Sequence, residues 1–560
     1  MYKYLTQHCP TIPKATSYKS LLIIQKILLA LLSGSILSLA FLNHELYYCA
    51  WFGFIPLLLA IEKTTLLQSY LIGLIAGLTL FTTAAYWIID FIELSKNYGI
   101  NSGYLLAGLF WFYSAHVIAL ATTFFKWFKQ QSKVHEFLLF PLTFVFFAST
   151  FPLLFPMRLG DTQVNFQSAL QAIEFVGVYG LDAIILLFNI VLYRVMVNVH
   201  AYQTKGMDRS KLPLFLSSSI IAAWFLYGIT AYSSWQSEIA TWETLKVGLV
   251  QVNERPSLGN SSYYPGYSQA YPPEMDMTER LNSAGADVII WPEAQKKNYL
   301  DGSNIKRAYQ KRMQVLNNHL IFQDMQHIHD PINGTIIEKY NSAIMINNQG
   351  QHADSYQKIK RIPFGEYTPM LEKDSIMADW VNGFFGGFFD EFNSELSQGE
   401  THTVFNHPKV NIIPLICYET TFPEFVANAV NNTSTTRELN NGAMLVGLSN
   451  DGWFGSSHLP YQHIMPSALR AVENRLPLVH VANNGPSIVV TPDGNVIFTS
   501  KFQQAAGYVV DVPHSNMSQG SFYSRYPALL TDSFVILFLI IMGLALKQRI
   551  LRKITAHSLE

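Results

Sequence analysis

Long apolar stretches occupy both ends of the chain, and a segment with shorter apolar runs lies between them. A helix needs about 20 consecutive apolar residues to cross the hydrocarbon core of a bilayer. By this criterion we predict about eight membrane spans, of which the second is short: residues 21–42, 47–61, 69–92, 103–125, 136–156, 176–198, 213–233 and 527–546. The pattern therefore predicts an α-helical transmembrane bundle of seven spans over 1–233 and an eighth span over 527–546.

The segment 234–526 shows a different pattern, in which short β-rich runs alternate with helical stretches. We predict strands at 245–252, 286–291, 342–347, 410–417, 443–449, 478–482 and 487–491, and helices at 305–319, 422–430 and 464–475. Most of these strands are apolar on both faces, which is typical of strands covered by helices. The segment is therefore predicted to be an α/β domain, with functional side chains at the carboxyl ends of its strands.

Composition agrees with a membrane protein. Of 560 residues, 49% are hydrophobic and 14% are charged, whereas charged residues make up about 25% of soluble proteins. The net charge is −1, and no basic stripe is present that would neutralise phosphates, so we expect no nucleic-acid partner.

Basic residues predict the orientation of the bundle. They follow the fourth, sixth and eighth predicted spans: Lys126, Lys129 and Lys133; Lys205, Arg209 and Lys211; and Lys547, Arg549, Arg552 and Lys553. An even number of crossings places all three groups on one side, which the positive-inside rule makes cytoplasmic. Segment 234–526 is then expected on the outer, periplasmic side, and 547–560 is expected as a cytoplasmic tail.

Cys417 is the only cysteine in segment 234–526, and it directly follows the apolar run 410–416. A lone cysteine cannot form a disulfide within its own domain, although the outer side of the membrane is oxidising. Three roles remain for it: a buried inert thiol, an intermolecular partner or a nucleophile.

Two further strand ends carry polar residues with matching chemistry. Glu293 follows the predicted strand 286–291, and Lys358 precedes the segment 361–369. Together with Cys417 they provide a carboxylate, an ammonium and a thiol, which suffice for acyl transfer. Glu293 would take the thiol proton, while Lys358 would lower the thiol pKa and stabilise an oxyanion. Each residue alone is more often a solvated glutamate, a surface lysine or an inert cysteine, and only their combination favours a site.

These motifs and several others resemble those of one family. They are Trp-Pro-Glu at 291–293, Lys358 before Pro-Phe-Gly-Glu at 363–366, Cys-Tyr-Glu at 417–419, Ser-Asn-Asp-Gly-Trp-Phe-Gly at 449–455, Tyr-Gln-His at 461–463, Arg-Ala-Val-Glu-Asn-Arg at 470–475, Asn-Asn-Gly at 483–485 and Phe-Tyr-Ser-Arg-Tyr at 522–526. With these motifs and its predicted spans, nearly the whole chain resembles the bacterial apolipoprotein N-acyltransferases, the membrane-bound branch of the nitrilase superfamily. At His480 and Tyr461 the chain departs from the family, which commonly has arginine and tryptophan there.

The resemblance implies roles for the site residues and a fold. Glu293 would be the general base, Lys358 the oxyanion stabiliser and Cys417 the nucleophile. Glu366 would support the site, and Tyr418 and Glu419 would be required neighbours of the nucleophile. The implied fold of segment 234–526 is a four-layer αββα sandwich.

The resemblance also implies a reaction and its partners. A phospholipid would donate an acyl chain to Cys417 as a thioester, and the α-amine of a diacylglyceryl-cysteine at a lipoprotein N-terminus would accept it. No cofactor and no metal would be needed. We further expect a monomer located in the bacterial inner membrane.

Two segments are candidates for loops that admit acyl chains. The segment 381–389 alternates aromatic residues, among them Phe384, Phe385 and Phe388, with glycines that suit a mobile lid. Trp453 and Phe454 form the second candidate. The alternative for both is an ordinary buried loop packed on the spans. His458, His463 and His480 match no usual metal-ligand spacing, so we expect no metal site there.

Two other functions fit parts of the sequence. A nitrilase-type amidase acting on a small amide would explain the three site residues, but it gives no reason for the spans. A catalytically silent membrane protein that binds lipids or lipoproteins would explain the spans, but it would not need Cys417.

Overall fold

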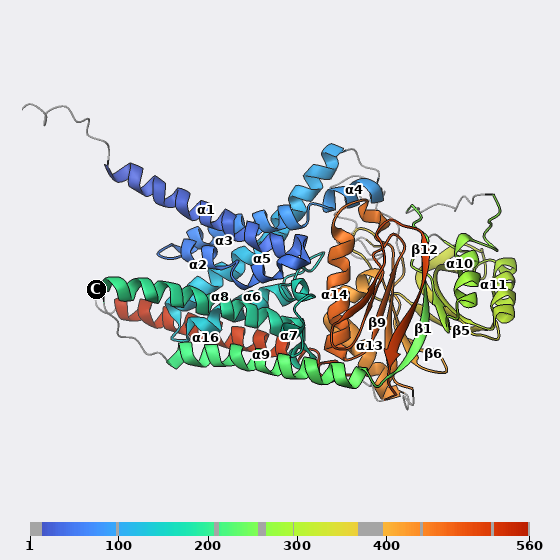
Figure 1. Cartoon of the computed structure of the whole chain (residues 1–560). Helices are drawn as coiled ribbons and strands as arrows, with labels where there is room; N and C mark the ends of the chain where they lie inside the picture. Colours follow the sequence, from blue (N-terminus) through green and yellow to red (C-terminus); the bar gives the residue numbers. More distant parts are fainter. Residues whose placement is uncertain are drawn as a thin grey trace, which may run out of the picture.

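The structure, a computed structural model, describes residues 14–96, 100–205, 212–255, 265–294, 296–367, 396–436, 441–516 and 520–557. It consists of a helical bundle and an α/β domain placed at one end of the bundle (Figure 1). The helices of the bundle are α1 (Lys14–Leu42), η1 (His44–Trp51), α2 (Ile55–Ala60), α3 (Leu66–Ala84), α4 (Ile88–Lys96), α5 (Ile100–Gln131), α6 (Glu136–Thr150), η2 (Gly160–Gln163), α7 (Gln167–Leu170), α8 (Ile173–Lys205), α9 (Leu212–Ile239) and α16 (Leu529–His557).

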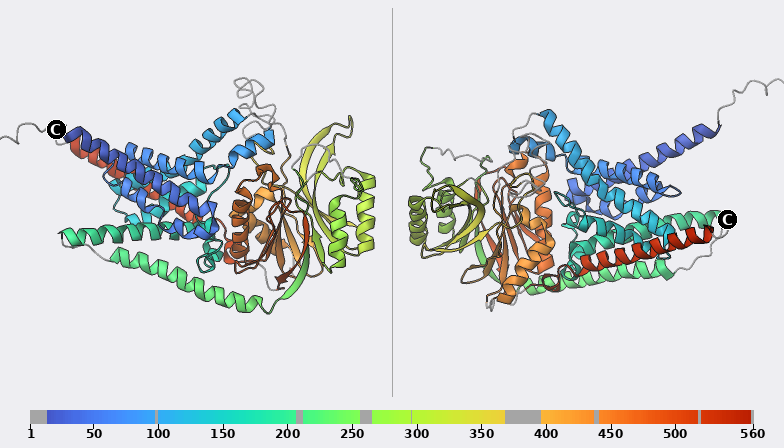
Figure 2. Two further views of the ribbon diagram at one scale, coloured as in Figure 1. Left: turned by 45° about the horizontal axis from the view of Figure 1, so that its top comes forward. Right: turned by 180° about the vertical axis from the view of Figure 1, so that it is seen from behind.

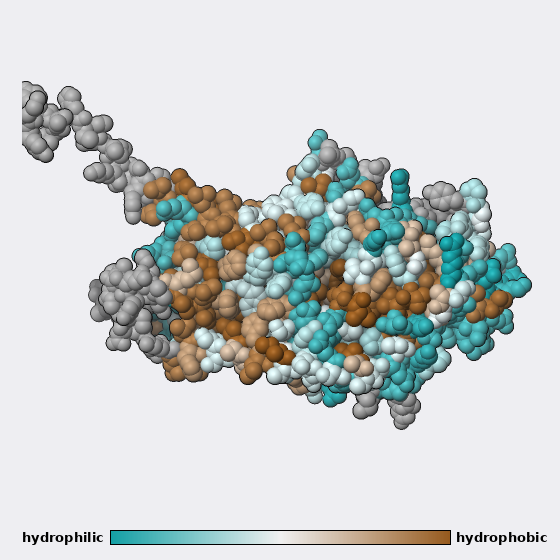
Figure 3. Space-filling model, viewed as in Figure 1, coloured by the Kyte–Doolittle hydropathy of each residue, from teal (hydrophilic) through white to brown (hydrophobic). Residues whose placement is uncertain are grey.

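Within the described residues, six helices are long and apolar enough to cross a membrane, namely those containing 21–42, 66–84, 103–131, 173–197, 212–239 and 529–552. Hydrophobic residues gather on the surface of the bundle, and hydrophilic ones gather on the far part of the α/β domain (Figure 3). Leu105 on α5 and Phe215 on α9 each expose 67% of their area. Exposing such apolar surfaces to water would be energetically unfavourable, so they indicate that the bundle contacts lipid. The protein is therefore a membrane protein.

The predicted second span is not one helix. Residues 47–61 form the end of η1 and the short α2, joined by a turn. This segment begins beside the α/β domain, where His44 stacks on His458. It ends near Glu62, whose backbone carbonyl accepts a hydrogen bond from Lys26 on α1. The amide of Asn189 on α8 bonds to the backbone at both Ala50 and Phe54, which satisfies polar groups that the break exposes.

The predicted span 136–156 is also shorter as a helix, because α6 ends at Thr150. Pro152 follows, and the residue before a proline disfavours helical backbone; Phe151 is accordingly extended. The remainder, residues 151–156, is an irregular segment that lies against the α/β domain and contributes to the candidate site described below.

The α/β domain contains, among its described residues, two six-stranded sheets in the orders β12-β1-β2-β3-β4-β5 and β11-β10-β9-β8-β7-β6. The strands are β1 (Glu243–Gln251), β2 (Val288–Ile290), β3 (His319–His329), β4 (Ile336–Ile346), β5 (His352–Gln357), β6 (Phe405–Asn406), β7 (Asn411–Ile416), β8 (Ala443–Ser449), β9 (Leu478–Ala482), β10 (Ile488–Val490), β11 (Val496–Thr499) and β12 (Ala506–His514). The centre of each sheet is parallel, with β1, β2 and β3 side by side in one and β7, β8 and β9 in the other.

Helices cover the outer face of each sheet, and the two inner faces pack on one another. Helices α10 (Pro273–Ser283) and α11 (Ser303–Leu316) lie on the first sheet, and α13 (Pro423–Thr436) and α14 (Leu459–Asn474) lie on the second (Figures 1 and 2). Apolar residues from both sheets, such as Val247, Ile290, Ile412 and Val446, form the core between them. This is the predicted αββα sandwich.

The second helical layer joins the domain to the bundle. Gln462 on α14 accepts a hydrogen bond from the Trp87 indole and donates one to the carbonyl of Ala84. At the other end of α14, Arg475 forms an ion pair with Glu174 on α8 at 2.9 Å. Helix α9 leads into β1 and α15 (Phe522–Arg525) leads into α16, so both ends of the domain are tied to long helices.

The predicted strands all lie on observed ones, but β3, β5, β6, β11 and β12 were not predicted. β3 pairs with β4 as a long antiparallel hairpin. The predicted helix 305–319 ends at Leu316, because Asn317 adopts the left-handed conformation with φ 51° and the chain turns into β3. Polar residues such as Gln323 and Gln326 interrupt the apolar pattern of β3, which obscured it.

Candidate active site

Cys417 lies at the carboxyl end of β7, where the strand gives way to the short helix η4 (Cys417–Thr421). Its backbone is left-handed, with φ 52°, and its side chain is buried. Such a conformation costs a non-glycine residue about 1–2 kcal/mol. The sharp turn lifts the thiol out of the sheet, and the surrounding hydrogen bonds have to hold it there.

Glu293 and Lys358 lie together at the matching end of the first sheet. Glu293 follows β2, and Lys358 follows β5, where its backbone N–H donates to the carbonyl of Asn341 on β4. The Asn341 amide donates to Glu293 at 2.7 Å, and the Lys358 ammonium donates to Glu366 at 2.8 Å. Asn341 also lies 3.3 Å from Glu366, so one amide links both carboxylates.

The charges of this group favour proton transfer. Burial lowers the pKa of Lys358, but Glu366, Glu293 and Cys417 raise it by more, and the ammonium stays charged. Burial raises the pKa of Glu293, and the attraction of Lys358 offsets this only in part. Burial and the Glu293 carboxylate also raise the pKa of Cys417, outweighing the opposite effect of Lys358. Lys358 thus lowers the pKa of the Cys417 thiol, as expected from the sequence, but the net pKa of the thiol is raised.

Glu419 connects the loop of Lys358 to the turn of Cys417. One carboxylate oxygen accepts hydrogen bonds from the Tyr356 hydroxyl and from the backbone N–H groups of Ile359 and Lys360, at 2.7–3.0 Å. The other accepts from the N–H of Ile416 at 2.8 Å. Because this fully buried carboxylate joins the ends of β5 and β7, it fixes the distance between the two sheets at the site.

Tyr418 points from the same turn toward the membrane bundle. Its hydroxyl donates to the carbonyl of Leu154, and its ring packs edge-on against Phe155 and Phe422. The neighbours of Cys417 thus face in opposite directions, with Glu419 toward the first sheet and Tyr418 toward the bundle.

A second polar group contacts Cys417 from the second sheet. Ser449, at the end of β8, lies beside the turn because β7 and β8 are parallel and Ile416 pairs with Leu448. Its hydroxyl lies 3.6 Å from the Cys417 sulfur and 3.0 Å from Asp451. His463 on α14 lies 2.8 Å from Asp451 and 3.3 Å from the Cys417 carbonyl oxygen. Ser449, Asp451 and His463 belong to the motifs at 449–455 and 461–463, but none of the three is among the site residues predicted from the sequence.

Donor atoms of Cys417, Asp451 and His463 lie within 4.8 Å of one another, a spacing that a metal ion can bridge. However, the same Asp451 oxygen already accepts hydrogen bonds from His463 and Ser449. Hydrogen bonding therefore accounts for the proximity of these atoms without an ion.

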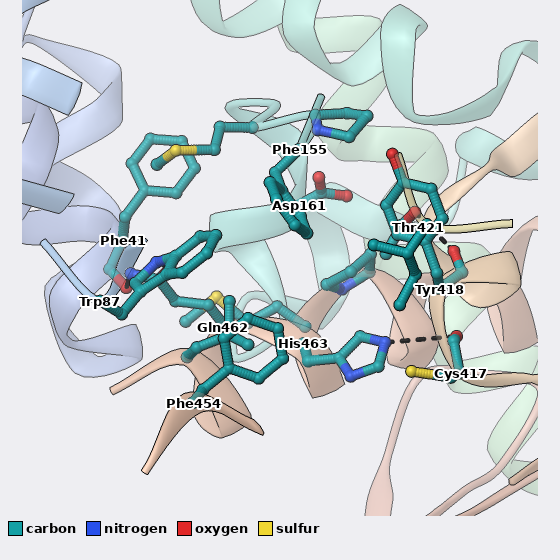
Figure 4. Close-up of a pocket in the computed structure, with 16 residues that line it drawn as sticks. Phe41, Trp87, Phe155, Asp161, Cys417, Tyr418, Thr421, Phe454, Gln462 and His463 are labelled. Carbon is teal, nitrogen blue, oxygen red and sulfur yellow. Dashed lines mark hydrogen bonds between the residues drawn. The ribbon is translucent and has the colours of Figure 1, made fainter. Parts of the chain in front are cut away.

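An apolar cavity connects Cys417 to the bundle. It has about 680 Å³ of empty space, in part open to the outside. Residues of both regions line it, among them Phe41, Trp87, Phe155, Cys417, Phe454 and His463 (Figure 4). Its lining is mostly apolar, which favours an apolar ligand.

The two loop candidates differ. Phe454 is buried in the cavity wall, where it stacks on Phe91 at 5.1 Å and meets the Trp87 ring edge-on. Trp453 is half-buried beside it. In this structure the loop packs on the helices and Phe454 lines the cavity, so a role of this loop in admitting acyl chains stays a prediction. The segment 381–389, with Phe384, Phe385 and Phe388, lies outside the described residues.

Family models match both regions of the chain. Residues 33–191 match the apolipoprotein N-acyltransferase N-terminal domain, and residues 246–513 match the carbon-nitrogen hydrolase family. An apolipoprotein N-acyltransferase of Geobacter metallireducens is 27% identical, over 93% of this chain and 95% of that protein. One of Rickettsia bellii is 25% identical, over 94% and 98%. Among solved structures, an amidase from Nesterenkonia sp. is 18% identical, covers 51% of this chain and 95% of its own, and has a TM-score of 0.34.

Proposed function

This chain belongs to the apolipoprotein N-acyltransferase family, and we propose that it N-acylates lipoproteins by carrying the acyl chain as a thioester on Cys417. The observation that carries this proposal is the apolar cavity built jointly by the bundle and the domain. It places a buried thiol, next to a carboxylate and an ammonium, at the end of a space suited to an acyl chain.

In the first half-reaction, Glu293 takes the proton of the Cys417 thiol as the sulfur attacks an ester carbonyl of a phospholipid. Its raised pKa makes it a stronger base than an ordinary glutamate. The Lys358 ammonium stabilises the oxyanion of the tetrahedral intermediate. Collapse of this intermediate breaks the ester bond, Glu293 returns the proton to the departing alcohol, and lysophospholipid leaves.

In the second half-reaction, the neutral α-amine of a diacylglyceryl-cysteine attacks the thioester carbonyl. Glu293 accepts a proton from the amine, and the sulfur leaves as the amide bond forms. The thiolate then regains a proton, which restores the starting state of the site. Ping-pong kinetics would be the signature of this sequence.

The proposal extends to the placement of the chain. The bundle 1–233 and the helix 527–546 would lie in the bacterial inner membrane, with the catalytic domain 234–526 on the periplasmic side and the tail 547–560 in the cytoplasm. Lys126 and Lys129 support this orientation, since they lie on α5 near its end distant from the domain (Figure 1). Both lipid substrates then reach the cavity from the outer leaflet.

The test uses Cys417→Ser and Cys417→Ala in a strain depleted of its own acyltransferase. We expect neither variant to N-acylate lipoproteins, and we expect mass spectrometry of the purified wild type to show an acyl adduct on the Cys417 peptide. Transfer by either variant would refute the role of Cys417. Hydrolysis of small amides without lipoprotein acylation would favour an amidase instead.

A further inference from the structure

The hydrogen bonds of His463 define its protonation state. Its Nδ1 lies 2.8 Å from the Asp451 carboxylate, and its Nε2 lies 3.3 Å from the Cys417 carbonyl oxygen. Two hydroxyl groups lie farther away, Ser449 at 3.4 Å from Nδ1 and Thr420 at 3.5 Å from Nε2. Each has a nearer acceptor for its single hydrogen, which is Asp451 at 3.0 Å for Ser449 and the Cys417 carbonyl at 3.1 Å for Thr420. A carbonyl oxygen only accepts, and so does an ionised carboxylate, so both ring nitrogens have to donate. Only the doubly protonated imidazolium donates at both. In the neutral ring with a proton on Nδ1, the Nε2 lone pair would face the carbonyl oxygen directly.

The charged groups around His463 agree with this assignment. Burial lowers its pKa, but Asp451, the Cys417 carbonyl and Glu293 raise it by more, and the net shift is upward. Burial raises the pKa of Asp451, but His463 and Ser449 lower this pKa by a larger amount. The net shift is downward, so the carboxylate stays ionised. His480 on β9 meets the His463 ring edge-on at 5.2 Å, and burial lowers its pKa to about 3, so it is neutral and does not repel the imidazolium.

Ser449 connects this ion pair to the sulfur. Its hydroxyl has one hydrogen and faces two acceptors, the Asp451 carboxylate at 3.0 Å and the Cys417 sulfur at 3.6 Å. His463 provides Asp451 with a second donor, so Asp451 keeps a hydrogen bond when the hydroxyl turns to the sulfur. The hydroxyl is thus available to a thiolate whenever one forms.

We propose that Asp451 and His463 form a buried ion pair at neutral pH that positions the nucleophile, with the His463 imidazolium holding the Cys417 carbonyl and Ser449 supplying a hydrogen bond to the thiolate. The carbonyl bond restrains the left-handed turn at Cys417, whose backbone is otherwise unfavourable. These are positioning residues, and they exchange no proton with the substrate. The inference rests on the part of the proposed function that makes Cys417 the nucleophile.

The sign of the pH dependence follows from the upward pKa shift of His463. The hydrogen bond to the Cys417 carbonyl is complete below the ordinary pKa of histidine and is lost as pH rises through the raised one. Asp451→Asn removes the main group that raises this pKa. In that variant we expect the alkaline fall of kcat to move to lower pH by at least about one unit.

The first measurement is ¹⁵N NMR of the full chain in detergent, labelled at histidine, with His463→Gln identifying the signal. We expect both ring nitrogens of His463 to be protonated at pH 7, and we expect their titration to move to lower pH in Asp451→Asn. This measurement needs no substrate, so it stands apart from any failure of the acyltransferase assay. A neutral His463 at pH 7 would overturn the proposal.

The second measurement is kcat over pH. We expect His463→Phe to lower kcat by about 10- to 100-fold, the size of a hydrogen bond from a charged donor, and His463→Gln, which keeps one donor, to recover part of this. His329→Gln, on the outer end of β3, is the matched control and keeps the wild-type profile. If Asp451→Asn lowered kcat uniformly and left the alkaline fall in place, the pair would be merely structural. Melting temperatures of all variants show which of them fold.

Discussion

Two groups of charged residues flank Cys417, and they use the same chemistry in opposite ways. On the side of the first sheet, Lys358 accompanies Glu293, whose pKa is raised. On the side of the second sheet, His463 accompanies Asp451, whose pKa is lowered. A carboxylate with a raised pKa can accept and return a proton, whereas one with a lowered pKa stays ionised. The charges and hydrogen bonds around a buried acid, rather than its residue type, therefore decide whether it acts as a base or as a support.

The largest effect is expected at the residue that both groups share. Cys417→Ala should lower N-acylation by about 1,000-fold or more, because the thiol that would carry the acyl chain is removed. The measurement is transfer from phospholipid to a lipoprotein peptide by purified protein. Cys49→Ala, at a buried cysteine of η1, is the control and should retain activity. Equal loss in both variants would show a folding defect instead.

Glu293→Gln tests the base on the first-sheet side. We expect kcat/KM to fall by about 10²- to 10⁴-fold. Glu293 has to be deprotonated to act, so wild-type activity should fall as pH drops through its raised pKa, and this acid limb should vanish in the variant. Glu338→Gln, at an exposed position of β4, is the control. A variant that retained the acid limb would show that another group titrates there.

Stability should separate the two acids most sharply. An acid whose pKa is higher in the folded than in the unfolded state destabilises the fold as pH rises and the acid ionises. Glu293 is such an acid, so Glu293→Gln should leave the melting temperature at pH 7 unchanged or raise it. A lowered pKa contributes stability above the unfolded value, so Asp451→Asn should destabilise the fold by about 1.5–3 kcal/mol. Thermal unfolding in detergent at pH 7 measures both. Destabilisation by both variants to the same degree would remove the distinction drawn between them.

The smallest effect is expected in the cavity wall. Phe454→Leu removes the stacking on Phe91 and leaves space beside the acyl chain. We expect KM for long-chain donors to rise about two- to tenfold with little change in kcat, because the lost contact is made equally before and during reaction. Phe498→Leu on β11 is the control. A change in kcat alone would mean that Phe454 acts on Cys417 instead of on the chain.

Much of the candidate site was predictable because its residues follow strands. Glu293 and Cys417 end apolar runs that are recognisable without any partner. Each lies at the carboxyl end of a parallel strand of its own sheet, and the face-to-face packing of the two sheets brings these ends together. Asp451 and His463 were not predictable, since their role depends on which atoms they face. Strand β12 was also not predicted. Its exposed residues alternate irregularly, and its position is decided by pairing with β1.

By itself, the sequence determined six of the eight predicted spans, the α/β character of the central segment and a set of residues whose chemistry suits acyl transfer. These depend on length, apolar periodicity and residue chemistry, which are local. Only the tertiary structure decided that residues 47–61 break into two short helices, that the bundle and the domain share one cavity, and that the pKa of Asp451 is lowered while that of Glu293 is raised. These outcomes depend on burial and on hydrogen bonds between residues far apart in the chain, and no local pattern records them.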